Sequence, residues 1–368
     1  MMHRWKGALA ALAIGTTVIF GAACSEDAES TTPTATTAAA STGATQAAAT
    51  AAPTEDPRAD WPEKFTIGFF GGDDAEAVLE RQQPFINYLT EVLGVEIEAF
   101  TGTSYGAVIE AMRADRVDAM VVGPFSYVLA VQEADAEAIG IYTPCSSSVE
   151  VCTYNPDAQP FYQSVIITKK GNGVESLEDL RGQSYAFVDP ASTSGHLAPK
   201  TLLIKNGLDP DSEMETVFAG SHPTAALAVF NGNTVGGGTN EGNLARLVGE
   251  GQIEACMWAD GEISKPRTQE EIDATFAACP DGHIAILAVT DPIPSTPFAV
   301  RSELPQTFKD AVRDALMAIK DDPALVEQTR YWYQDPTESL GLERLDHFFN
   351  SLRDIARLLD LDLKSIEG

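Results

Sequence analysis

The chain has 368 residues and a formal net charge of −30, from 54 acidic residues against 24 lysines and arginines. Hydrophobic residues make up 44% of it, enough for one or two substantial cores, so a uniformly disordered chain is excluded. The acid surplus also excludes a protein that holds nucleic acid by general electrostatics, which requires an excess of basic residues. A soluble protein in an extracytoplasmic or salty setting fits this balance.

The N-terminus has the organisation of an export signal. A short basic start precedes an apolar run over residues 7–20, which is too short to span a bilayer comfortably. Small residues then lead to Cys24, as in a bacterial lipoprotein signal, although Gly21 stands where such signals usually have Leu. We expect residues 1–24 to be a lipoprotein-type signal peptide, with Cys24 as the lipid anchor. The alternative is an ordinary cleavage site beside a bystander cysteine.

Residues 25–60 form a segment made almost entirely of Ala, Thr, Ser, Pro and acidic residues. A segment without large apolar residues has nothing to bury, so we expect a disordered tether. The order of signal, lipidated cysteine, tether and domain is that of a domain anchored on a flexible stalk.

From residue 65 onward, short apolar strands alternate with amphipathic helices, as in βαβ units. The first half is predicted to hold strands over 65–70, 95–100 and 118–122, and helices over 79–93 (entered or bent at Pro84) and 105–114. The second half is predicted to hold strands over 164–168, 185–188, 284–289 and 297–301, and helices over 176–182, 194–207, 224–230, 306–319 and 342–359.

This pattern predicts an α/β fold of two lobes, each a mixed sheet flanked by helices, with a ligand cleft between them. Lobe 1 is expected to comprise residues 61–163 plus about 280–368, including the C-terminal helices. Lobe 2 is expected to comprise residues 164–279.

Four cysteines follow Cys24, and an even number in an exported chain indicates two disulfides. Short-range pairing is the economical connectivity and gives Cys145–Cys152 and Cys256–Cys279, with the other two pairings left open. Neither these spacings nor the five histidines match a zinc site, so we expect no metal or other cofactor.

Two loops that precede predicted helices carry side chains suited to an anion. Ser192, Thr193 and Ser194 lie between a strand end and a helix start, where hydroxyls and the first helical N–H groups both donate. One hydroxyl is enough for an N-cap, so three in succession favour anion binding. In the second loop, His222 is able to donate to an oxyanion even when neutral; taken alone, it is better explained as a surface histidine.

Several motifs occur in order along the chain: TSY at 103–105 before VIEAM at 108–112, VDA at 117–119 before GPFSY at 123–127, FYQSV at 161–165, DPASTSG at 189–195, and GSH at 220–222 before ALAV at 226–229. With this set, residues 65–325 resemble the solute-binding proteins of phosphate, phosphite and phosphonate ABC importers. The resemblance implies a type II periplasmic-binding-protein fold.

In that family two tyrosines, a Ser-Thr-Ser loop and a histidine surround a tetrahedral oxyanion. The resemblance implies these roles for Tyr105, Tyr162, Ser192, Thr193, Ser194 and His222. Further candidates for ligand contact are Ser126, Tyr127, His196, Ser221 and Asn240. Ser126 and Tyr127 are expected at the C-terminal end of a strand, where open α/β sheets bind ligands.

One position departs from the family. Val235 stands where the family usually has an Asp, after the helix that follows His222. An Asp there would accept a proton from the ligand or pair with an ammonium group, so we expect a preference other than 2-aminoethylphosphonate. The glycines at 236–238 are expected to leave room for backbone contacts or a bulkier ligand.

The predicted function is capture of phosphonate, phosphite or phosphate between the lobes, without covalent chemistry, and delivery to an ABC permease. The protein is expected to act as a monomer at the outer face of the cell membrane, as a lipoprotein, or in the periplasm. One alternative is a binding protein or sensor partner for another small anionic or organic solute. The other is a hydrolase using Ser192 or Ser194 with His196 or His222, although neither serine lies in a G-x-S-x-G elbow.

Overall fold

The computed structural model describes residues 56–72, 75–145 and 151–359, which belong to one compact unit of the chain. The predicted signal peptide with Cys24, and residues 25–55 of the predicted tether, lie outside the described residues. Among the helices within these ranges, none has the length and apolar character needed to cross a membrane.

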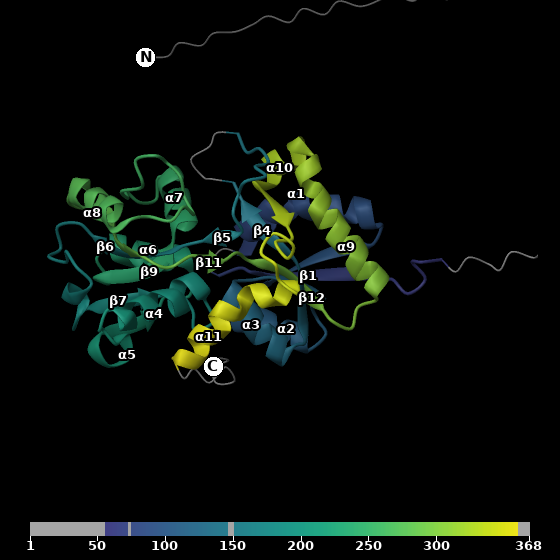
Figure 1. Ribbon diagram of the computed structural model, residues 1–368, viewed down its shortest axis with the longest axis horizontal. Coiled ribbons are helices and arrows are strands. Elements are labelled where there is room, and N and C mark those ends of the chain that lie inside the picture. The colour runs from purple at the N-terminus through teal and green to yellow at the C-terminus, as the bar shows by residue number, and fades with distance from the viewer. Residues whose placement is uncertain (1–55, 73–74, 146–150, 360–368) are drawn as a thin grey trace, which may run out of the picture. The chain divides into compact units, whose positions relative to one another are not determined.

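The first sheet has six strands in the order β13-β4-β12-β3-β1-β2 (Figure 1). Their bounds are β1 Lys64–Phe70, β2 Glu96–Gly102, β3 Ala119–Val121, β4 Ala136–Pro144, β12 Pro297–Arg301 and β13 Tyr331–Gln334. The sheet is mixed, because β1 runs parallel to β2 and β3 whereas β12 runs antiparallel to β3 and β4.

Helices bury both faces of this first sheet. One face packs against α1 (Ala75–Leu93), α9 (Gln306–Ala318) and α10 (Pro323–Thr329). The other packs against α2 (Tyr105–Arg113), α3 (Pro124–Glu133) and α11 (Asn350–Leu358). Alternation along β1 explains the layering, since Phe65, Ile67 and Phe69 all point into the core on the α1 side.

The second sheet has five strands in the order β10-β6-β9-β7-β8. Their bounds are β6 Ser164–Lys169, β7 Ser184–Phe187, β8 Glu215–Phe218, β9 Gly236–Asn240 and β10 Ile284–Val289. Around it lie α4 Ala198–Lys205, α5 Pro210–Glu213, α6 His222–Phe230, α7 Glu241–Gly249 and α8 Gln269–Ala278. Both faces are buried, with α6, α7 and α8 on one and α4 on the other.

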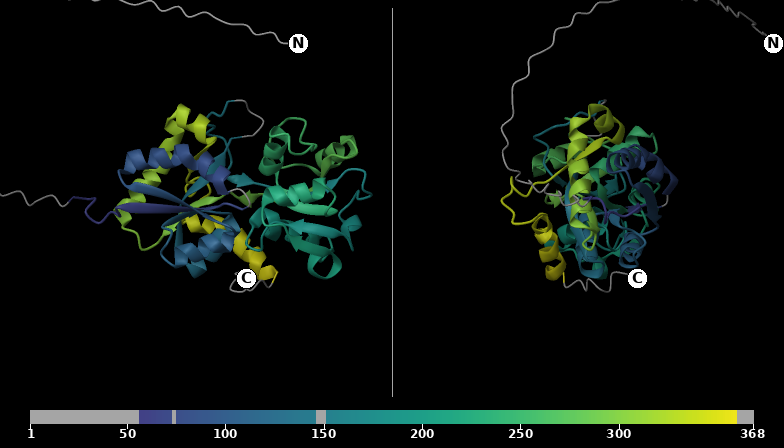
Figure 2. Two further views of the ribbon diagram at one scale, coloured as in Figure 1. Left: turned by 180° about the vertical axis from the view of Figure 1, so that it is seen from behind. Right: turned by 90° about the vertical axis from the view of Figure 1, so that its right-hand side faces the viewer.

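Two short antiparallel strands, β5 (Phe161–Tyr162) and β11 (Ile293–Pro294), lie where the chain passes between the sheets. The chain crosses into the second sheet from β5 to β6 and returns from β10 through β11 to β12. Figure 2 shows this arrangement from two further sides. Each lobe is therefore a mixed sheet covered by helices, as predicted.

The structure corrects the predicted elements at several points. The second lobe extends past residue 279, because β10 pairs antiparallel with β6 and buries Ile284 and Ile286 in that lobe's core. Helix α1 begins at Ala75, so Pro84 lies inside it and does not mark its start. The predicted helix over 342–359 is a 3₁₀ turn, Leu345–Phe349, followed by α11.

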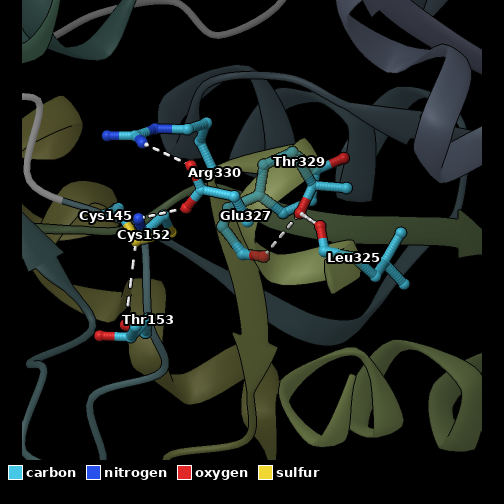
Figure 3. The surroundings of a disulfide bond; sticks show 8 residues. Cys145, Cys152, Thr153, Leu325, Glu327, Thr329 and Arg330 are labelled. Carbon is cyan, nitrogen blue, oxygen red and sulfur yellow. Dashed lines mark hydrogen bonds and ion pairs between the residues drawn. A yellow bond between two sulfur atoms is a disulfide. The ribbon is translucent and has the colours of Figure 1, made fainter. Parts of the chain in front are cut away.

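The predicted pairing of the four cysteines is confirmed: Cys145 bonds to Cys152 and Cys256 to Cys279. Around the first disulfide, the Cys145 backbone N–H donates to the Arg330 carbonyl over 2.9 Å, and the Cys152 N–H donates to the Glu327 carboxylate (Figure 3). Hydrogen bonds from both cysteines of this disulfide thus connect the segment after β4 to the C-terminal end of α10.

Removing the Cys256–Cys279 disulfide, with both residues changed to Ala, is expected to lower the free energy of unfolding by about 2–4 kcal/mol. The bond spans 23 residues and constrains the unfolded chain. Equilibrium urea unfolding measures the loss. The matched control is the Cys145→Ala, Cys152→Ala pair, whose span of 7 residues predicts a smaller loss. An unchanged unfolding midpoint for the first pair would contradict the prediction.

Candidate functional site

A cavity of about 760 Å³ is lined by residues from both lobes. Its lining includes all six residues for which the family resemblance implies ligand contact, and we refer to these as the donor cluster: Tyr105, Tyr162, Ser192, Thr193, Ser194 and His222. The structure therefore brings together side chains that are up to 117 positions apart in the sequence. Their role in binding stays a prediction.

The hydroxyl loop of the donor cluster leaves β7 in a tight turn. The Asp189 carboxylate accepts from the Ala191 N–H over 2.8 Å, and the Asp189 carbonyl accepts from the Ser192 N–H over 2.9 Å. The Ser192 hydroxyl then caps the π-helical turn Thr193–Leu197 by accepting from the Gly195 N–H. Only glycine fits at 195, because a Cβ there would lie 2.3 Å from the Val188 side chain.

Thr193 also joins the two lobes. Helix α3 of the first lobe has Gly123 at its N-cap, which supplies no capping side chain. Thr193 of the second lobe takes that place, since its Oγ1 accepts from the Phe125 N–H over 2.8 Å. In return, the Ser126 hydroxyl donates to the Ala191 carbonyl over 2.8 Å. Ser126, a candidate for ligand contact, thus lies on α3 in a contact between the lobes and not in the cavity lining.

The two tyrosines of the donor cluster are protonated donors at neutral pH. Tyr105 begins α2 and stacks on Phe70, with ring centroids 4.0 Å apart. Burial raises the pKa of Tyr105 well above its usual value. Burial also raises the pKa of Tyr162 to about 12, although hydrogen bonding with Ser194 and Thr193 acts in the opposite direction.

His222 is the first residue of α6, and Ser221, another candidate for ligand contact, serves as the N-cap of that helix. The imidazole Nδ1 lies 3.0 Å from the Thr239 hydroxyl. Burial lowers the pKa of His222 from 6.5 to about 4, and the positive charge of Arg246 adds to the shift. The ring is therefore neutral at pH 7.

The remaining candidates have other partners. Tyr127 lies on α3, not at a strand end, and its hydroxyl donates to Asp346 over 2.8 Å. His196 has its Nδ1 2.8 Å from the Pro190 carbonyl and its ring against Phe187 and Phe218. Neither residue lines the cavity. Asn240 does line it, and its side chain caps α7.

The expectations for Val235 and the glycine run need correction. Val235 lies just before β9, at the end of the strand opposite to Asn240. Five residues of extended strand, about 16 Å, separate Val235 from Asn240, which lines the cavity. It therefore does not face a ligand in the cavity. The room beside the glycines is filled by protein, because Cβ atoms at 236, 237 and 238 would lie 2.8–2.9 Å from Leu180, Val229 and Pro199.

Sequence reasoning missed several residues that line the cavity, among them Gln163, Glu241, Asn243 and Arg246. The Glu241 carboxylate is buried, and its oxygens accept from Trp258 Nε1 (2.7 Å) and the Ser264 N–H (2.6 Å). Burial raises the pKa of this carboxyl. Asn240 carried a usable signal, because Asn is one of the favoured N-cap residues and marks the start of α7.

A smaller cavity of about 250 Å³ lies in the first lobe, where its lining mixes acidic and basic side chains. Lys309 there is already paired with Glu137 over 2.6 Å. In the ranges that the structure describes, no group of three or more His, Cys, Asp or Glu side chains is placed to hold a metal ion.

Two mixed α/β lobes, linked by two crossings and with a cavity lined from both, form the fold of the type II periplasmic-binding-protein class. The comparison with protein families agrees, since residues 67–338 match the family described as "ABC transporter, phosphonate, periplasmic substrate-binding protein". The chain belongs to this family.

Two curated relatives come from bacteria. The "Phosphate-import protein PhnD" of Mycolicibacterium smegmatis is 29% identical over 181 residues, covering 47% of this chain and 54% of that protein. The "Phosphonates-binding periplasmic protein" of Escherichia coli is 27% identical over 256 residues, covering 68% and 64%. The chain thus spans between half and two thirds of the length of these relatives.

Among solved structures, PhnD1 from Prochlorococcus marinus in complex with methylphosphonate has a similar fold, with a TM-score of 0.58 at 15% identity. The match covers 83% of this chain and 99% of that chain.

Thr193→Val is expected to lower the free energy of unfolding by about 1–3 kcal/mol, because the buried Phe125 N–H loses its acceptor. Thr193→Ser keeps the hydroxyl and is the matched control, with a smaller loss. Urea unfolding of the three proteins tests this. A valine variant as stable as the wild type would show that Thr193 does not cap α3.

The free energy of unfolding is expected to fall as the pH drops from about 6.5 toward 4, partly through His222. In that interval the unfolded chain holds a proton on this residue that the folded protein does not, so acid favours unfolding. His222→Gln lacks this proton and should lose less stability between about pH 7 and about pH 5. Equal losses in parallel urea titrations would contradict the assignment.

Proposed function

We propose that the protein captures a small tetrahedral oxyanion, namely a phosphonate, phosphite or phosphate, and delivers it to the permease of an ABC importer. The observation that carries the proposal is the donor cluster, in which hydroxyls, phenols and an imidazole from both lobes line one cavity. Ser164 supports the grouping, because its hydroxyl lies 2.6 Å from the Ser194 carbonyl oxygen and 3.0 Å from the Thr239 carbonyl oxygen, and its one proton is shared between them. The hydroxyl loop and the partner of His222 are thereby held side by side.

Neutral donors suit a bound anion in a protein with a strongly negative net charge. Each hydrogen bond to a charged group contributes about 1.5–3 kcal/mol, and more of that energy is kept where water is excluded. The hydroxyl loop meets this condition, since Ser192 and Thr193 are each only 1% exposed. Because the donors come from both lobes, a ligand in the cavity would favour their closure around it.

The names of the relatives support the choice of ligand. One is a phosphate-import protein, another a phosphonates-binding protein, and the structural neighbour holds methylphosphonate. We extend the proposal to an exported monomer that acts by binding alone, anchored through Cys24 at the outer face of the cell membrane or free in the periplasm. The ABC permease is its proposed membrane partner.

A hydrolase is disfavoured by the hydrogen bonds of the two histidines. Within the described residues, His196 Nδ1 is bonded to the Pro190 carbonyl and His222 Nδ1 to Thr239, and neither ring is hydrogen-bonded to the Ser192 or Ser194 hydroxyl. The serine–histidine pair that activates a nucleophile is therefore not formed.

We further propose that the preferred ligand lacks an amine. The reason is no longer Val235 but Glu241, a buried carboxylate in the cavity lining whose two oxygens are already hydrogen-bonded to Trp258 and Ser264. Two lone pairs remain on these oxygens, but the side chain is only 1% exposed and burial raises the pKa of the carboxyl, which makes it a weaker partner for an ammonium group. Glu80, the other carboxylate of the lining, is an exposed side chain of α1.

Calorimetric titration with phosphate, phosphite, methylphosphonate, 2-aminoethylphosphonate and sulfate tests both statements. We expect saturable binding of at least one of the first three ligands, accompanied by a rise in the thermal unfolding midpoint. A flat response to the whole panel would reject oxyanion binding. Tightest binding of 2-aminoethylphosphonate would reject only the amine preference.

The site itself is tested by Ser192→Ala and Tyr162→Phe, each of which removes one donor and should weaken binding roughly 10- to 100-fold. The matched control is Ser212→Ala, at an exposed serine of α5 outside the cavity lining, which should bind as the wild type does. Unchanged affinity in both site variants would place the ligand elsewhere.

A further inference from the structure

A chain of hydrogen bonds runs from the surface of α7 to the imidazole of the donor cluster. Arg246 Nη2 donates to Asn243 Oδ1 over 3.2 Å, and Asn243 Nδ2 donates to Thr239 Oγ1 over 3.1 Å. Thr239 Oγ1 in turn lies 3.0 Å from His222 Nδ1. Asn243 and Arg246 are three residues apart on α7 and so lie on the same face of that helix.

The direction of each hydrogen bond in this chain follows from its first member. A guanidinium has only donors, so the atom of the Asn243 amide that faces Arg246 is the oxygen. The NH₂ group therefore faces Thr239, whose hydroxyl oxygen accepts. Glu250 holds Arg246 in place, because both of its carboxylate oxygens lie 2.8 Å from Nη1.

Thr239 is left with one proton to donate. Its side chain is fully buried, and a buried hydroxyl proton without an acceptor is costly. Among the described residues, the remaining neighbour of this oxygen is His222 Nδ1. The hydroxyl therefore donates to Nδ1, and the proton of the neutral ring lies on Nε2.

We infer that Asn243 and Thr239 are positioning residues that fix His222 as its Nε2–H tautomer and so present an N–H donor to the cavity. The inference rests on the proposed function, in which an oxyanion receives that donor. With the opposite tautomer, Nε2 would present a lone pair to the ligand's negative oxygen. Nε2 has no hydrogen-bond partner among the described residues, which leaves it available to a ligand.

The full-length protein labelled with ¹⁵N-histidine allows the tautomer to be observed directly, because the nitrogen shifts of a neutral imidazole differ between its two forms. His222→Gln identifies the His222 signals. At about pH 7, where the ring is neutral, we expect the Nε2–H form in the unliganded wild type. The Nδ1–H form would overturn the inference.

Asn243→Asp provides the sharper test. A carboxylate at 243 still accepts from Arg246 but also accepts from the Thr239 hydroxyl, so Thr239 has no proton left for His222. The ring should then donate from Nδ1, which converts it to the Nδ1–H tautomer. Thr239→Val should remove the tautomer preference, whereas Thr239→Ser retains the hydroxyl and should restore it.

Methylphosphonate titration then measures the consequence. We expect Thr239→Val to weaken binding roughly 10- to 100-fold, as for the loss of one hydrogen bond to a charged group, and Thr239→Ser to recover most of it. Circular dichroism checks that each variant is folded. A wild-type tautomer and wild-type affinity in Asn243→Asp would overturn the inference. If no anion of the panel binds the wild type, the proposed function fails, while the tautomer spectra still decide the hydrogen-bond direction.

Discussion

The hydrogen bond from the Phe125 N–H to the Thr193 hydroxyl is the contact on which the site depends most. It satisfies the start of α3, which its own N-cap residue Gly123 leaves uncapped, and it joins the two lobes at the loop that carries the donor cluster. Because the Thr193 oxygen already accepts from Phe125, its own proton is directed elsewhere. One side chain thus couples helix stability, the approach of the lobes and the orientation of a donor.

The proposed binding of an anion by an acidic protein requires that local contacts outweigh the overall charge. A net charge of −30 produces a field that salt screens beyond about 8 Å, whereas hydrogen bonds act at contact distance. The tyrosines are protonated at neutral pH even at their ordinary pKa, and burial raises that pKa further. Burial lowers the pKa of His222 to about 4, so every ionisable member of the donor cluster is uncharged at neutral pH and has a proton to donate.

Much of the fold could be predicted from periodicity, and the failures have physical causes. The strands over 284–289 and 297–301 match β10 and β12, because they are short apolar runs between turn residues. β9 was missed because its three glycines carry no strand signal, and α3 because it is buried on most of its surface and lacks a polar face. The family motifs located the donor cluster. Asn243 was missed because it acts on His222 through Thr239, and Thr239 meets His222 only through tertiary packing.

The glycines of β9 have a consequence for how this protein is able to vary. They let α4 and α6 approach the strand from opposite faces, since a Cβ at 237 would strike Val229 of α6 and one at 238 would strike Pro199 of α4. His222 begins α6, so a side chain at 237 would press on the helix that carries the imidazole. Residues outside the cavity lining therefore constrain the donor cluster. A lineage adapting to a new solute would have to change residues that line the cavity while keeping glycine at positions 236, 237 and 238.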